Sequence, residues 1–157
     1  MDFNVGIAFV TAIITIAVIA VAVHRGPRSL VQYIFAFAML LLALEAAFTG
    51  LVFRSALNSE FLFWQMAFFI VSSLVPPAWL LFSVSFARAN YMEQISKWKW
   101  VLLLSVIAPL LLIIFFNKDF ISLVLSPEIS STLFIRTGWA GYLWHIISVI
   151  ISIAILM

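Results

Sequence analysis

The only charged side chain within the long apolar stretches of this sequence is the carboxylate of Glu45. Holding a carboxylate in the hydrocarbon of a membrane costs at least a few kcal/mol, so such residues usually face other helices and find a partner. Glu45 is therefore a candidate proton or ligand site. The alternative is a structural carboxyl group that is protonated, or hydrogen-bonded to Thr49 one helical turn further on.

A second candidate, His145, lies in a row of small and polar residues at helical spacing. The row comprises Gly138, Gly141, His145, Ser148 and Ser152. Small residues at this spacing allow helices to approach closely, which predicts that this face packs against other helices. Because a lone histidine without further ligands at suitable spacing is seldom a metal site, we favour packing over metal binding.

Pro76 and Pro77 follow one another in the middle of the third apolar stretch. Neither has a backbone N–H, so the carbonyls of Ser72 and Ser73, four residues earlier, lose their helical partners. Serine hydroxyls, neighbouring helices or water can satisfy these carbonyls, and a kinked helix is then tolerated in a membrane. The pair predicts a bend, which acts either as a hinge that relays a signal or as a shape that improves packing.

Motifs for catalysis are missing from the sequence. It contains no HExxH motif, no glycine-rich phosphate loop and no cysteine. The chain therefore lacks a thiol nucleophile, a thiolate metal site and any disulfide, and it lacks a recognisable catalytic set. We expect no catalytic, cofactor-binding or metal-binding residues here.

The elements that position these candidates are those of an integral membrane protein. Of the 157 residues, 66% are hydrophobic and 9% are charged, whereas soluble domains average roughly half apolar and a quarter charged. A spanning helix takes about 20 apolar residues, so the chain has room for about five spans with ordinary loops. The net charge of +2 is spread over loops, which gives no sign of a nucleic-acid surface.

The expected fold class is all-α, a polytopic transmembrane helical bundle. The predicted spans are residues 3–23, 29–53, 61–86, 100–116 and 139–157. Residues 119–137 contain two short β-branched runs around a turn-like segment, which predicts a short extracytoplasmic β-hairpin or interfacial segment; an irregular loop that dips into the headgroups is the alternative. The sequence stops at Met157 inside an apolar run, so we expect a fragment of a longer chain, truncated at its C-terminus.

The positive charges favour one orientation in the membrane. Cytoplasmic loops collect lysine and arginine, and the first and third loops hold five such residues against three in the second and fourth. The five are Arg25, Arg28, Arg88, Lys97 and Lys99, and the three are Arg54, Lys118 and Arg136. This asymmetry predicts an N-terminus outside and a fifth span that returns to the cytoplasm.

The third stretch carries the most recognisable pattern. It reads Phe63-Trp64-Gln65-Met66, then Leu74-Val75-Pro76-Pro77-Ala78-Trp79-Leu80-Leu81-Phe82-Ser83-Val84-Ser85-Phe86-Ala87-Arg88. These residues resemble a span in the seven-transmembrane N-terminal sensor region of bacterial membrane histidine kinases. Pro109, Arg136-Thr137-Gly138-Trp139 and Gly141-Tyr142-Leu143-Trp144 are similar to that family as well. The likeness is greatest to the kinases of the PEP-CTERM/exosortase exopolysaccharide systems, although Glu45 stands where the family often places an aromatic residue.

The resemblance implies a non-catalytic, multi-pass input module in the bacterial inner membrane. Such a module relays a membrane or periplasmic cue, after two further spans, to a cytoplasmic kinase core that this sequence does not contain. The resemblance also implies a homodimer formed through the parent kinase, a cytoplasmic response regulator as partner, and the lipid bilayer as surroundings. Glu45, Pro76, Pro77 and His145 are then the candidate sensing or relay residues.

Two other functions stay open at this point. One is a small transporter or channel subunit in which Glu45 and His145 line a polar path. The other is a passive membrane scaffold. Transporters tend to have internal repeats and several polar groups within the membrane, and the sequence has no convincing repeat and few such groups.

Overall fold

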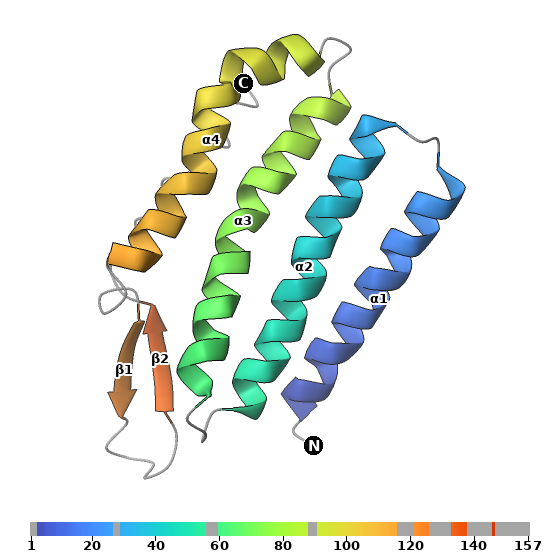
Figure 1. The fold of residues 1–157 in the computed structure, drawn as a ribbon. Coiled ribbons are helices and arrows are strands. Elements are labelled where there is room, and N and C mark those ends of the chain that lie inside the picture. Colours follow the sequence, from blue (N-terminus) through green and yellow to red (C-terminus); the bar gives the residue numbers. More distant parts are fainter. Residues whose placement is uncertain are drawn as a thin grey trace.

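The fold is built from long helices. The computed structural model describes residues 3–26, 29–55, 60–87, 91–115, 121–125 and 133–137, together with Ile146. The elements in this part of the chain are α1 (Phe3–Arg25), α2 (Leu30–Arg54), α3 (Phe61–Ala87), α4 (Tyr91–Phe115), β1 (Ile121–Leu125) and β2 (Leu133–Thr137) (Figure 1). The protein is therefore all-α in class, with one short pair of strands beside the helices.

Each helix packs against its neighbour in the sequence: α1 against α2, α2 against α3, and α3 against α4. Figure 1 shows the four helices side by side in chain order, with consecutive helices running in opposite directions. Short connections favour this antiparallel arrangement of neighbours. As a result, α1 and α3 end where α2 and α4 begin. We call this the basic end, because Arg25, Lys97 and Lys99 lie there.

Three helices of the described residues are long and apolar enough to cross a membrane. They are Phe3–Arg25, Leu30–Arg54 and Phe61–Phe86. Polar residues delimit them as the sequence suggests. The hydroxyl of Ser29 caps α2 by accepting a 3.3 Å hydrogen bond from the backbone N–H of Gln32, which satisfies one of the donors left free at a helix start.

Helix α4 begins well before the fourth predicted span. Residues 91–99, which fall in the loop between the third and fourth predicted spans, are helical. Within this segment, Ile95 and Trp98 pack against the buried Leu80 and Val84 of α3. These apolar residues extend the stripe by which the helix contacts its neighbour, so tertiary packing carries the helix into a stretch whose composition is mixed.

Small residues line the interface between α1 and α2. Ala8 and Ala12 of α1 and Ala43 and Gly50 of α2 are buried. A Cβ atom built on Gly50 would lie 3.1 Å from Cε2 of Phe9 and 3.3 Å from Cβ of Ala8. The two backbones therefore approach as closely as helices in membranes do when small residues face each other.

Large apolar side chains, by contrast, face outward. Val10, Ile13 and Phe37 are each more than half exposed, at 55%, 66% and 53%. Many other large apolar side chains of the described helices are exposed as well, whereas soluble proteins rarely expose large continuous apolar surfaces. The arrangement suits a surface in contact with lipid chains, where exposing a large aliphatic side chain carries no penalty.

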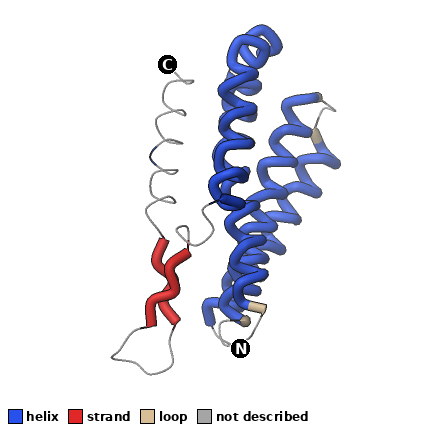
Figure 2. The backbone as a smooth tube through the Cα atoms, turned by 60° about the vertical axis from the view of Figure 1, so that its left-hand side comes forward, coloured by secondary structure: helices blue, strands red, loops and turns tan. Residues whose placement is uncertain are grey.

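The two strands pair in antiparallel register, with Ile121 opposite Thr137 and Leu125 opposite Leu133. They fall within residues 119–137, where the sequence predicts a hairpin or interfacial segment. Figures 1 and 2 both place the pair toward the end of the bundle at which α1 begins. The fifth predicted span, residues 139–157, lies outside the described residues except for the helical Ile146, so the count of five spans stays a prediction.

Candidate functional site

The carboxyl group of Glu45 is hydrogen-bonded across the interface between α2 and α3. The hydroxyl of Ser72 donates to Oε1 of Glu45 at 2.6 Å. The hydroxyl of Thr49 donates instead to the backbone carbonyl of Glu45, at 2.8 Å. The described partner of the carboxyl group is thus on the neighbouring helix and not one turn along its own, which is how polar groups within a membrane join two helices.

The packing of α2 against α3 explains why these two residues meet. Ala38 and Leu41 of α2 form a buried cluster with Ala78 of α3. Glu45 follows Ala38 by about two helical turns, and Ser72 precedes Ala78 by nearly two. Because the helices are antiparallel, Glu45 and Ser72 are displaced in the same direction, and by a similar distance, from the contact between Ala38 and Ala78. The two side chains therefore lie at the same level of the interface.

The prolines lie one helical turn beyond this hydrogen bond. Helix α3 runs from Phe61 to Ala87 with Pro76 and Pro77 inside it. The hydroxyl of Ser73 donates to the carbonyl of Ile70, in its own helix, at 2.7 Å. Ser72 differs, because its hydroxyl donates to Glu45 of another helix. Its backbone carbonyl receives no helical hydrogen bond from Pro76, which has no N–H. A bend at the prolines remains a prediction from the sequence.

Gln65 is a polar residue of α3 that the sequence analysis did not single out. Its side chain is only 4% exposed, and its Oε1 atom has no hydrogen-bond partner among the described groups. Gln65 precedes Ser72 by two helical turns and therefore lies on the same side of α3. The sequence does hold an indication of this residue, because Gln65 and Ser72 are polar residues seven positions apart in an apolar stretch. Gln65 carries no charge, so charge alone does not reveal it.

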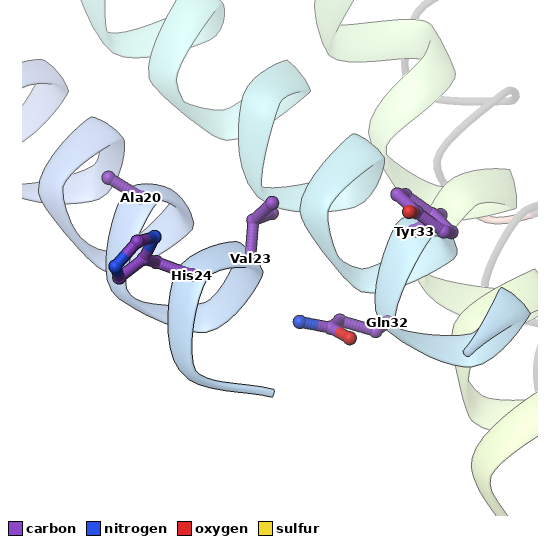
Figure 3. Close-up of a pocket in the computed structure, with 5 residues that line it drawn as sticks. All are labelled: Ala20, Val23, His24, Gln32 and Tyr33. Carbon is purple, nitrogen blue, oxygen red and sulfur yellow. The ribbon is translucent and has the colours of Figure 1, made fainter. Parts of the chain in front are cut away.

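A second glutamine joins α1 to α2 at the basic end. The amide nitrogen of Gln32 donates to the carbonyl of Ala22, and its Oε1 atom is buried without a partner in the described structure. Figure 3 shows Gln32 pointing toward the last turn of α1, between His24 and Tyr33, in a cavity of about 470 Å³. A Cβ atom on Gly26 would lie 2.5 Å from the Gln32 nitrogen, so this contact needs glycine at position 26.

The remaining candidates lie outside the described residues. They are Gly138, Gly141, His145, Ser148 and Ser152. In the part of the chain that the structure describes, no three histidine, aspartate or glutamate side chains gather closely enough to bind a metal ion. The polar groups brought together here are the carboxyl group of Glu45 and the hydroxyl of Ser72, which form a contact between helices one turn from the two prolines.

Comparison with known proteins identifies the family. The sequence matches the family described as the N-terminal 7TM region of histidine kinase, over residues 7–157. No curated protein and no solved structure matches the chain. The matched residues include all four helices almost completely, the strand pair and the Glu45–Ser72 contact. The chain therefore belongs to the family of membrane-embedded, seven-transmembrane N-terminal regions of histidine kinases.

Proposed function

We propose that this chain is the input module of a two-component histidine kinase and that it relays a membrane or periplasmic cue to a cytoplasmic kinase core. Family membership supports the sensor assignment. The observation that carries the relay is the hydrogen bond from Ser72 to Glu45, one helical turn before Pro76. A relay needs two helix arrangements that differ by only a few kcal/mol, so that a cue can shift their populations.

The serines near the prolines suggest what the second arrangement is. Ser73 and Ser85 of α3 direct their hydroxyls to carbonyls of their own helix, whereas Ser72 bonds Glu45 of α2. If α3 changes its bend, the hydroxyl of Ser72 can give up its hydrogen bond to Glu45 and donate to a backbone carbonyl one turn earlier in α3. Ser73 and Ser85 already bond their own helix in this way. Each state then keeps the hydroxyl satisfied. The exchange releases α2 from α3, and its cost is the Ser72 hydrogen bond that the Glu45 carboxyl group loses.

The finer topology belongs to the same proposal. We place five spans in this sequence and the N-terminus outside the bacterial inner membrane, with the basic end toward the cytoplasm. The strand pair then lies on the extracytoplasmic side, since it is found toward the end at which α1 begins. The kinase core would supply the homodimer and the contact with a response regulator, and the PEP-CTERM/exosortase systems are the setting that the sequence resemblance suggests.

Autophosphorylation of the full-length kinase in membrane vesicles tests the relay. We expect Ser72→Ala to change the basal rate about threefold, because breaking the contact removes a coupling of about 0.6 kcal/mol between the two helices. Ser73→Ala is the matched control, since its hydroxyl bonds its own helix, and it should stay near the wild-type rate. Replacing Pro76 and Pro77 by alanine should also alter the rate while membrane insertion survives.

Two outcomes would overturn the proposal. Equal rates for wild type, Ser72→Ala and the double alanine variant would indicate a passive scaffold. Proton or solute flux in proteoliposomes that disappears in Glu45→Gln would favour the transporter, in which Glu45 and His145 line a polar path. Glu45→Gln is informative in the kinase assay too, because its amide oxygen still accepts the Ser72 hydrogen bond and should keep the basal rate close to wild type.

A further inference from the structure

An apolar cavity of about 300 Å³ lies where α2, α3 and α4 meet. Phe37 of α2, Pro77 and Leu81 of α3, and Leu102 and Val106 of α4 line it. Every lining side chain is apolar. An apolar cavity of about half this volume stays free of water and binds apolar molecules such as benzene or xenon. The cavity therefore suits a hydrocarbon ligand and offers nothing to a polar one.

The cavity opens where a membrane lipid would reach it. Phe37, on its rim, is 53% exposed. It follows the first residue of α2, Leu30, by seven residues, a rise of about 10 Å. The hydrocarbon core of a bilayer is about 30 Å thick, or about 15 Å per leaflet, so the cavity lies within the leaflet next to the basic end. It is within reach of a lipid acyl chain whose headgroup stays at the basic end.

Lys99 lies on the same side of α4 as the cavity and nearer the membrane surface. Lys99 precedes Leu102 by three residues and Val106 by seven, which places it on the cavity side about 4.5 Å nearer the membrane surface. Its ammonium group lies over the ring of Trp100, 5.7 Å from the ring centroid. Tryptophan and lysine together are typical of the headgroup level of a membrane. Lys97 is two and a half turns from Val106 and so lies on the opposite side of α4.

We propose that this cavity is a binding site for an anionic phospholipid. One acyl chain fills the cavity between α2, α3 and α4, and the phosphate-bearing headgroup pairs with Lys99. The positive charge of Lys99 favours anionic over neutral headgroups, and the apolar cavity binds the acyl chain. The site is distinct from the Glu45–Ser72 contact, and the proposal stands whether or not α3 relays a signal.

Photolabelling in vesicles tests the site. The purified full-length kinase is reconstituted in equal mixtures of phosphatidylglycerol and phosphatidylcholine. Either lipid carries a diazirine in its acyl chain, and the labelled residues are mapped by mass spectrometry. We expect the phosphatidylglycerol probe to label Leu81, Leu102 and Val106 about fivefold more than the phosphatidylcholine probe does. Equal labelling by both probes, or none at these residues, would refute the proposal.

Matched variants separate the headgroup from the cavity. Lys99→Gln should remove the preference for phosphatidylglycerol, whereas Lys97→Gln, the same change on the opposite side of α4, should retain it. Val106→Phe fills the cavity and should reduce labelling of Leu81 and Leu102 several-fold, whereas Ile107→Phe, at an exposed neighbouring position, should not. Loss of the preference in Lys97→Gln to the same extent as in Lys99→Gln would show general surface attraction and overturn the site.

Discussion

Ser72 of α3 donates a 2.6 Å hydrogen bond to the carboxyl group of Glu45 of α2, a residue 27 positions earlier in the sequence. This bond fastens the two helices one turn before two prolines. It gives a carboxyl group within a membrane span a specific partner, as the cost of its burial demands.

A double-mutant cycle measures this contact. We expect Glu45→Ala and Ser72→Ala to be coupled by about 0.6 kcal/mol, and by no more than about 1.7 kcal/mol, in the free energy of unfolding in micelles. Thr49→Val with Ser72→Ala is the control cycle, because the Thr49 hydroxyl bonds the backbone of Glu45. A coupling for Glu45 and Ser72 that does not exceed the control would contradict the contact.

The close approach of α1 and α2 predicts a large effect at one glycine and a small one at another. Gly50→Leu should lower the free energy of unfolding by about 1 to 3 kcal/mol, because Phe9 and Ala8 occupy the space of its side chain. Gly6→Leu, where nothing lies within 4 Å of the new Cβ atom, should leave the free energy nearly unchanged. Similar unfolding midpoints for the two variants would mean that the helices do not pack in this way.

The glutamines at positions 65 and 32 should respond differently to replacement by leucine. Gln65→Leu removes an amide oxygen that has no partner in the described structure, so we expect a gain of about 1 kcal/mol in the free energy of unfolding. Gln32→Leu removes the hydrogen bond to the carbonyl of Ala22 together with an amide oxygen that also has no partner in the described structure. The loss and the gain offset each other, so we expect little net change in the free energy of unfolding. Thermal unfolding measures both. A marked loss of stability in Gln65→Leu would show that its amide oxygen is used.

The orientation can be tested with single cysteines, since the sequence has none of its own. Glu60 lies just before the first residue of α3, and Glu93 lies near the first residue of α4. Both are exposed, and they are at opposite ends of the bundle. Each is replaced by cysteine in turn. With the N-terminus outside, a membrane-impermeant thiol reagent added to intact cells should label Glu60→Cys and spare Glu93→Cys until the membrane is opened. The reverse pattern would place the basic end in the periplasm.

The amino-acid sequence alone indicates that this is a helical membrane protein and shows which of its residues are unusual for a membrane span. Long apolar runs separated by Arg25, Ser29 and Arg54 set the helix ends, because hydrogen-bonded helices are the simplest way to satisfy a backbone in hydrocarbon. Glu45 is conspicuous in the sequence as the only charged residue within a long apolar stretch, and the pattern around Pro76 and Pro77 indicated the family to which the chain belongs.

The partners of these residues, by contrast, depend on how the helices pack. Thr49 is the local neighbour of the Glu45 carboxyl group, yet Ser72 of another helix binds it, because the register of α2 against α3 is set by the packing of Ala38 and Leu41 on Ala78. The early start of α4 at Tyr91 depends on contacts with α3 as well. Helical periodicity indicates which face of a helix a residue occupies, but the neighbour that fills that face is selected by the packing of all the side chains along the interface.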